Sequence, residues 1–488
     1  MKRFNILIIA ILGVFAFSSC EDFLDKKPTN SADSATAITS LRDAELFMNA
    51  INSKMLSGSY LGRDMLLYAD AKGGDMTIYT AGRGYDTFYA FDHSAQSGAS
   101  SGFWTQGYNI LLQLNTLLSN IESLEAAGSQ EDFDDIKGQA YTLRGMLYFD
   151  LVRLYGEPYN EDKTAWGVPN ITTILSADAQ ELRATVEQNY TQILSDLKAG
   201  EPLLSKSRKD GYVNYWANKA LQARVYLHME DFANALTAAE DIIDNGPYSL
   251  YENDEWVASW ASKEGKESIF QLKVLAAEDR LTTGSLGGVY SRAKHYMSSV
   301  LGYYMVSEYF LERLGEDPED VRWGVMTHDE SSEDRLGCCY KYLGGVDMPG
   351  DGGGDAAACN VKVIRLSEVY LIAAEAALRK ASPDKKAAAD YLNEIRKRAP
   401  NLDPATAETI DLDMILDERS KELVCEGHRF WDMIRNNKTI EFNDDWQGVP
   451  ASRRDKTIDR TSHLTILPIF ESELNANPGL RDQQNPGY

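Results

Sequence analysis

Cysteine is scarce in this chain, with five among 488 residues. Cys20 closes an N-terminal apolar segment, which leaves Cys338, Cys339, Cys359 and Cys425 for the rest. Four cysteines are too few for a disulfide-stapled scaffold, and a composition of 43% hydrophobic and 25% charged residues is that of an ordinary globular protein. One bridge from Cys338 or Cys339 to Cys359 would close a loop rich in glycine and aspartate, but spacing alone does not decide whether it forms.

Long apolar runs are also lacking, apart from residues 4–17. That run is shorter than the roughly 20 apolar residues that a membrane-spanning helix needs. It follows Lys2 and Arg3 and precedes Ser18-Ser19-Cys20, which is the layout of a secretory signal peptide.

The end of this segment, residues 17–20, resembles a bacterial lipobox. It predicts that residues 1–19 are removed and that Cys20 is acylated. Each buried CH₂ contributes roughly 0.8 kcal/mol, and more than one acyl chain makes an anchor stable. A plain signal peptide that contains a cysteine is the alternative. Residues 20–40 are then the lipidated N-terminus and a spacer, and residues 41–488 are expected to form a single domain.

Positive charge is in short supply. The chain has 49 Lys and Arg against 74 Asp and Glu, a formal net charge of -25. Removal of Lys2 and Arg3 with the signal peptide would bring the body to about -27, two charges below the value for the whole chain. Such a charge repels nucleic acid and anionic lipid, so no nucleic-acid partner is expected.

Catalytic and cofactor motifs are missing as well. The sequence has no H-E-x-x-H, no P-loop and no dinucleotide fingerprint. Residues 98–102 spell G-x-S-x-G, but the polar and aromatic stretch before them does not read as the buried strand that a nucleophile elbow requires. Asp347, Asp351 and Asp355 could offer oxygen ligands to Ca²⁺, but their spacing does not match an EF-hand loop, which favours a solvated turn. A carboxylate pair for glycoside cleavage stays open because nothing singles one out. The sequence predicts no enzyme, no metal and no cofactor.

Helical periodicity dominates what is present. Apolar residues recur at three- and four-residue steps over 104–124, 132–155, 181–199 and 215–245. Alanines alternate with large residues over 215–245, with a break near Asp231, and again over 366–399, with a break at Ser382-Pro383. This pattern is similar to tetratricopeptide repeats, in which small residues let paired helices approach closely. The predicted fold is mainly α, a tetratricopeptide-like scaffold with loop-rich insertions at 60–103 and 246–360 that carry a few short strands. The aromatic residues of these insertions are expected to face a ligand, because loops seldom bury a row of them.

Four pieces of sequence resemble the SusD/RagB family of outer-membrane nutrient-binding lipoproteins of Bacteroidota. They are Cys20-Glu21-Asp22-Phe23-Leu24-Asp25, then Trp104 with Tyr108, Leu111 and Asn115, then the Arg/Glu-rich run 419–435, and finally Leu467-Pro468-Ile469 with Gln484-Asn485-Pro486-Gly487-Tyr488. The resemblance implies a cell-surface protein that sits as a lid on a SusC-like TonB-dependent transporter. It implies a glycan ligand or, as in the RagB branch, a peptide.

The resemblance also suggests a binding site. The family's glycan site lies around the start of the first long helix and the loops that face it. In this sequence that region holds Arg83, Tyr85 and Trp104 and, less directly, Tyr290 and Tyr296. Trp104 matches the helix-start pattern, while the others match by region only, and a packing role for Trp104 is left open.

Run 419–435 places Glu422, Glu426, Arg429, Asp432 and Arg435 three and four residues apart, which predicts one helix with shared charged faces. We interpret these charges as ion pairs that lock the helix against its neighbours, and not as a catalytic cluster.

Overall fold

A computed structural model describes residues 38–78, 84, 86–97, 101–262, 265–274, 284–290, 302–329, 332–342, 359–443 and 454–488. Its helices are α2 (Leu41–Met55), α3 (Asp64–Lys72), α4 (Ser101–Ala126), α5 (Asp134–Tyr155), α6 (Tyr159–Asp162), α7 (Val186–Gly200), α8 (Tyr215–His228), α9 (Phe232–Asn245), α10 (Asn253–Ser259), α11 (Leu286–Tyr290), α12 (Glu308–Leu314), α13 (Leu366–Arg379), α14 (Lys385–Arg396), α15 (Leu412–Glu422), α16 (Arg429–Arg435) and α17 (Glu471–Ala476). The strands are β1 (Met76–Ile78), β2 (Ser268–Leu272), β3 (Tyr304–Val306), β4 (Met326–Asp329), β5 (Ser332–Cys339), β6 (Val361–Arg365), β7 (Ile440–Glu441) and β8 (Thr457–Ile458).

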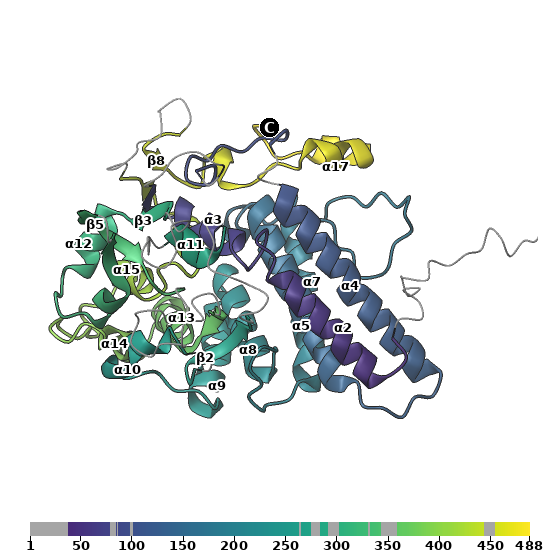
Figure 1. The fold of residues 1–488 in the computed structure, drawn as a ribbon, viewed down its shortest axis with the longest axis horizontal. Coiled ribbons are helices and arrows are strands. Elements are labelled where there is room, and N and C mark those ends of the chain that lie inside the picture. The colour runs from purple at the N-terminus through teal and green to yellow at the C-terminus, as the bar shows by residue number, and fades with distance from the viewer. Residues whose placement is uncertain are drawn as a thin grey trace, which may run out of the picture.

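The helices pack in a continuous series. α4 packs on α5, α5 on α7, α7 on α8, α8 on α9, α9 on α13, and α13 on α14 and α15. In Figure 1 the long α4 and α5 lie side by side with α2, and the α8, α9, α13 and α14 group lies beside them. The predicted mainly α, tetratricopeptide-like fold is therefore confirmed.

The first alanine-rich repeat begins and ends where the sequence predicts, while the second begins at Leu366 as predicted and its last helix ends at Arg396, before the predicted end at 399. Ala223 and Ala239 in the first pair, and Ala373 and Ala388 in the second, are fully buried, so the paired helices come close together. The break near Asp231 is a helix start, because its carboxylate accepts from the backbone N–H of Asn234 at 3.3 Å.

The strands form two-stranded antiparallel pairs: β1 with β3, β2 with β6, β4 with β5, and β7 with β8. The β2–β6 pair is the one that matters for the charged interior. It places Ser268 opposite Arg365, at the start of α13, and so brings Glu267 beside the Arg365 guanidinium.

The C-terminal segment covers one end of the helical body and lies along the upper edge of Figure 1. Leu467 N–H donates to the carbonyl of Leu154 at 2.7 Å, and the Asn485 amide donates to the carbonyl of Tyr155 at 2.8 Å. These bonds satisfy carbonyls at the end of α5 that the helix itself leaves unpaired.

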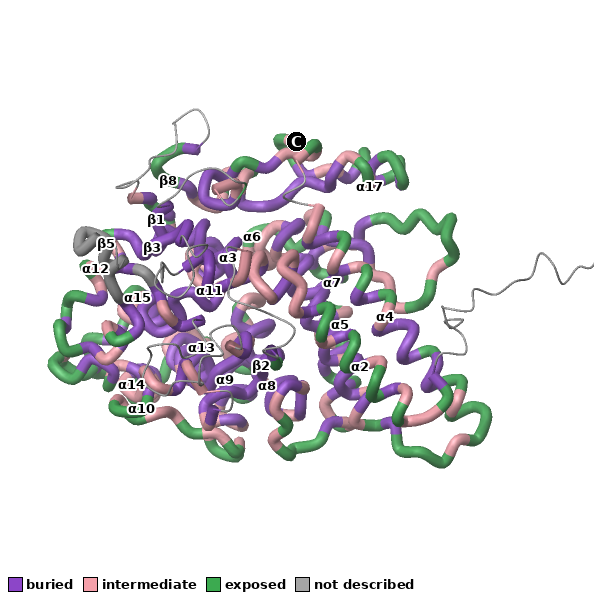
Figure 2. Tube along the Cα trace, in the orientation of Figure 1, coloured by how far each residue is buried: buried purple, intermediate pink, exposed green. Residues whose placement is uncertain are grey.

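Region 60–103 differs from the loop that the sequence predicts. It contains α3, in which every residue from Met65 to Lys72 is buried. The expectation that its aromatics face a ligand is wrong for Tyr68, Phe88, Tyr89 and Phe91, which are all buried. The trace around the α3 label in Figure 2 is purple, the colour of buried residues. The ring of Tyr68 stacks on Trp431 at 5.6 Å, so these side chains form core between α3 and α16.

Run 419–435 also differs, since it is two helices and not one. α15 ends at Glu422 and α16 begins at Arg429. Between them Cys425 and Gly427 have φ angles of +62° and +79°, a left-handed conformation that a helix cannot contain.

Two further findings concern the thiols and the membrane. Cys339 and Cys359 do not form a bridge with each other, which is one of the two pairings that the sequence left open, and the side chain of Cys338 lies outside the described residues. Within the described ranges, no helix is both long enough and apolar enough to cross a bilayer.

Candidate functional site

Trp104 lies in the first turn of α4, as its position in the sequence suggests, but its side chain points into the protein. It is 4% exposed. Its ring packs against Tyr108, Tyr155 and Phe470 at centroid distances of 4.9, 5.1 and 6.5 Å. The geometry is that of a packing residue between α4, α5 and the C-terminal segment.

Tyr290 is likewise buried, at 1% exposure. Its hydroxyl donates to Asp70 at 2.7 Å, and the same carboxyl accepts from the backbone N–H of Gly427 at 3.1 Å. Burial raises the pKa of Asp70 well above its usual range, against the effect of these two donors. Tyr290 thus ties α11 to α3 and to the turn before α16. Sequence reasoning missed Asp70 because nothing near it marks a buried acid.

The remaining predicted residues lie outside the described part of the chain. They are Cys20, Arg83, Tyr85 and Tyr296, together with the three aspartates of the calcium alternative, Asp347, Asp351 and Asp355. The structure gives Trp104 and Tyr290 different neighbours and does not bring them together. Ligand contact by these residues stays a prediction, and the burial of the two described ones does not support it.

The charges of run 419–435 form the ion pairs that the sequence predicts. Arg365 reaches Glu426 at 2.7 Å, Glu422 at 2.9 Å and Glu267 at 3.0 Å. Lys341 donates to Glu426 at 2.7 Å and to the carbonyls of Glu422 and Val424 at 2.9 Å. The acids at the turn between α15 and α16 are therefore neutralised by Lys341, which follows β5, and by Arg365, at the end of β6.

A second set of pairs continues this cluster along α16. Asp432 accepts from Arg419 at 2.8 Å and from Arg435 at 2.8 Å, and Arg435 also reaches Glu375 at 2.5 Å. The side chains of all four are at most 5% exposed.

The electrostatics of the cluster fit a structural role. Burial alone would raise the pKa of Glu422, but the guanidiniums of Arg365, Arg398 and Arg322 lower it to about 2. A carboxylate held so far from neutrality is a poor proton donor or acceptor at neutral pH, where a general acid or base works best. Glu422 has a side-chain exposure of 0%, so a substrate has no path to it.

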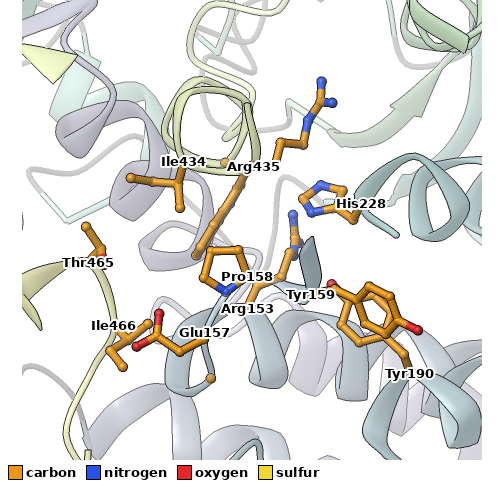
Figure 3. A pocket seen from close by; sticks show the side chains of 12 residues that line it. Arg153, Glu157, Pro158, Tyr159, Tyr190, His228, Ile434, Arg435, Thr465 and Ile466 are labelled. Carbon is orange, nitrogen blue, oxygen red and sulfur yellow. The ribbon is translucent and has the colours of Figure 1, made fainter. Parts of the chain in front are cut away.

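An open pocket lies where α5, α7 and α8 meet α16 and the C-terminal segment (Figure 3). About 400 Å³ of empty space is lined by Arg153, Tyr190, His228 and Arg435, among others. Both arginines are engaged by acids, Arg153 by Asp150 at 2.5 Å. Burial and then the charges of Arg153 and Arg435 lower the pKa of His228 well below 6.5, so the imidazole is neutral. Arg153 and Arg435 are therefore held in ion pairs of the fold, and we assign the pocket no ligand.

Metal ligation has no support in the described residues either, where no group of three or more His, Cys, Asp or Glu side chains could hold an ion.

Comparison with known proteins decides the family. Residues 266–488 match a family model described as the SusD family, and residues 22–227 match one described as "Starch-binding associating with outer membrane". A SusD superfamily protein of Bacteroides thetaiotaomicron VPI-5482 is 32% identical, with a TM-score of 0.83 over 92% of this chain and 100% of its own. This chain belongs to the SusD family.

Other members of the SusD superfamily fit over similar lengths. One from Bacteroides vulgatus ATCC 8482 is 33% identical, with a TM-score of 0.82 over 92% of this chain and 100% of its own. A laminarin binding SusD-like protein is 21% identical, with a TM-score of 0.70 over 92% of this chain and 99% of its own, and shows the shared fold. The SusD-like protein P38 of Formosa agariphila is 23% identical over 100% of this chain and 99% of its own length.

Proposed function

We propose that this protein is a cell-surface lipoprotein of the outer membrane that binds a glycan and delivers it, as a lid, to a SusC-like TonB-dependent transporter. The observation that carries the proposal is membership of the SusD family along nearly the whole chain. The names of two relatives, one of them laminarin binding, and the starch-binding description of the N-terminal family model support a glycan as the ligand.

The same proposal excludes catalysis. The densest cluster of acids and bases in the described residues is the buried one around Glu422 and Asp432, and its charges are paired. We infer that bound glycan leaves the protein chemically unchanged.

The second candidate ligand is a peptide, as the RagB branch of the resemblance implies. The strong negative charge bears on the choice between glycan and peptide only where the peptide is acidic. At a formal net charge of -25, long-range repulsion disfavours acidic peptides, while a neutral glycan is unaffected.

Glycan binding is tested by applying the purified protein to an array of polysaccharides and, in parallel, to a library of short peptides. We expect retention of at least one polysaccharide and no new reducing ends after incubation. Binding that is confined to peptides would replace the proposed ligand, and release of reducing ends would overturn the proposal that no chemistry occurs.

The lid role is tested by extracting membranes of the native host in mild detergent and purifying the tagged protein. A lasting partnership needs an interface of roughly 2,000 Å² or more, which survives such a purification. Recovery of the protein with no barrel of the TonB-dependent class would overturn the pairing.

A further inference from the structure

The described cavity best suited to hold several sugar units lies away from Trp104 and Tyr290. It is a groove between α2 and β2 with a cavity volume of about 340 Å³, and it opens to solvent. Small-molecule sites commonly enclose about 300–1,000 Å³. Its lining includes Asn49, Asn52 and Ser53 from α2, Gly211 and Tyr212 from the turn before α8, and Lys273 after β2.

The α2 side of this groove presents two amides, Asn49 and Asn52, and the hydroxyl of Ser53. Positions 49, 52, 53 and 56 are three and four residues apart, so they share one face of the helix. The neighbouring face, with Met48, Ile51 and Met55, is fully buried and fixes the rotation of α2. The amide face is therefore held in place by the core beneath it.

The hydrogen-bonding capacity of the groove is only partly used. Tyr212 hydroxyl donates to the Asn49 amide oxygen at 2.5 Å. The Asn52 amide nitrogen lies 3.5 Å from the Gly211 carbonyl, at the long limit of a hydrogen bond. The Asn52 amide oxygen is buried and has no partner. A buried acceptor without a donor costs free energy. Because this oxygen is shielded from solvent, a ligand hydroxyl reaches it only if the weakly held Asn52 amide turns toward the groove.

The opposite wall is apolar apart from one charge. Gly211 has a φ angle of +89°, and a Cβ there would lie 3.0 Å from Lys273 Cγ, so the lysine stem packs directly against the turn. Leu272 completes this wall, and Leu56 closes the α2 side of the groove at the end of the helix. No acid is among the described lining residues, and Lys273 is the one charged group among them.

We propose that this groove, formed by Asn49, Asn52, Ser53, Tyr212 and Lys273, is a binding site for a neutral oligosaccharide. Amide and hydroxyl groups match sugar hydroxyls, and the leucines and the tyrosine ring match the apolar C–H faces of a pyranose. The lack of lining acids disfavours cationic ligands, and the net negative charge of the chain disfavours anionic ones. The inference rests on the proposed function, because it names where the glycan binds.

A purely structural role is the competing reading, in which Tyr212 pins the turn before α8 to α2. Variants separate the two. Asn52→Leu removes the unpartnered acceptor, and Tyr212→Phe removes the hydroxyl but keeps the ring. Ser53→Trp adds bulk at an exposed position of α2 and fills the groove without removing a contact of the core. Asn245→Leu, an exposed amide at the end of α9, is the matched control.

The probes are laminarihexaose and maltohexaose, joined by any other neutral oligosaccharide that the wild-type protein retains on an array. Affinity is measured by titration calorimetry and stability by thermal unfolding. We expect Asn52→Leu and Ser53→Trp to weaken binding at least tenfold, Tyr212→Phe to weaken it severalfold, and Asn245→Leu to leave it unchanged, with melting temperatures close to wild type.

Wild-type affinity in both Asn52→Leu and Ser53→Trp would overturn the groove and leave the proposed function standing. A crystal structure with the oligosaccharide bound elsewhere would do the same. A wild-type protein that binds no glycan on the array would overturn both proposals, so the two failures are distinguishable.

Discussion

At the scale of single residues, an aromatic ring has two possible roles here, and exposure separates them. Trp104 lies at a helix start that the family resemblance links to ligand binding, but it is buried between Tyr108, Tyr155 and Phe470. Its indole also donates to Glu473, whose pKa is raised by burial and lowered by that hydrogen bond. A side chain with these contacts contributes to the stability of the fold and not to ligand binding.

Trp104→Ala should therefore lower the free energy of unfolding by about 3–5 kcal/mol, the usual effect of removing a core tryptophan. Affinity per folded molecule for any bound oligosaccharide should stay close to wild type. Leu112→Ala, at a position of α4 that is 48% exposed, is the control and should change stability little. A large loss of affinity in Trp104→Ala without a loss of stability would restore Trp104 to the binding site.

Lys72 shows how a buried charge adapts. Its ammonium nitrogen lies 2.9 Å from the Tyr68 hydroxyl and 3.2 Å from both His93 Nε2 and the Leu464 carbonyl, which are neutral groups. Burial lowers the pKa of Lys72 well below 10.5, and burial together with the charge of Lys72 lowers that of His93 to about 2.

The sign of the pH effect follows from this shift. Between the lowered folded pKa of Lys72 and 10.5, the unfolded chain binds more protons than the folded one, so stability rises with pH. Lys72→Met removes this dependence. The difference in unfolding free energy between wild type and Lys72→Met should rise by up to about 1.4 kcal/mol per pH unit within that window. Urea unfolding at a series of pH values measures it, and a difference that is constant with pH would show that Lys72 keeps its ordinary pKa.

At the scale of elements, the turn between α15 and α16 requires a glycine at position 427. Gly427 has a φ of +79°, and a Cβ there would lie 2.8 Å from the Cα of Leu66 in α3. Gly128, after α4, has a φ of +90° but nothing within 4 Å of such a Cβ.

These two glycines form a matched pair. Gly128→Ala should cost about 1 kcal/mol from backbone strain alone. Gly427→Ala should cost at least about 2 kcal/mol more, because α3 has to move away from the turn. The midpoints of urea unfolding at unchanged slope give both values. Equal losses in the two variants would mean that α3 and the turn are not tightly packed.

The pair between α8 and α13 makes a second prediction. Glu368 accepts from Arg224 at 2.8 and 2.6 Å, and although burial opposes it, Arg224 and then His428 lower the pKa of Glu368 to about 2. Since the folded pKa is below the unfolded value near 4.5, this stabilisation is present above pH 4.5 and is lost as the pH falls toward 2.

Glu368→Gln should destabilise the protein by about 3–5 kcal/mol at pH 7, because Arg224 is left buried without its counter-charge. The difference from wild type should shrink below pH 4.5, because Glu368 of the unfolded chain takes up a proton there while the folded carboxylate stays ionised. Thermal unfolding across pH 3–7 checks this, and a difference that is the same at every pH would contradict a charge-based role.

Sequence patterns predicted the helices that have one apolar and one polar face. They missed α3, which is buried on every side and therefore has no polar face. The alanine-rich repeats and the α4–α5 hairpin follow from periodicity because each helix is partly solvated. Tyr68 and Tyr89 look like loop aromatics in the sequence, but Tyr68 packs against Trp431 of α16 and Tyr89 packs against Tyr304 and Phe442. In the sequence, the amides of α2 look like part of a solvated helix face. In the structure, Gly211 and Lys273 lie opposite them, and the space between forms the groove.

At the scale of the whole molecule, two opposite effects are expected at a membrane: the acidic body is repelled by anionic lipid, and the predicted N-terminal anchor attaches the protein. A body with a formal net charge of -25 is repelled by anionic lipid headgroups. We therefore expect stable attachment to come from acyl chains at Cys20, where several chains would each contribute roughly 0.8 kcal/mol for every buried CH₂.

Cys20→Ala should release the protein from the membrane fraction of its host. The experiment needs a strain without the partner transporter, because a barrel that binds the body would retain it without any lipid. In that strain the wild-type chain should sediment with the outer membrane, while Cys20→Ala should be recovered in the soluble fraction. Cys339→Ala, which removes a free thiol of the folded body, is the matched control and should sediment with the membrane. If Cys20→Ala stays with the membrane without the transporter, the acidic body has another means of attachment and Cys20 is not the anchor.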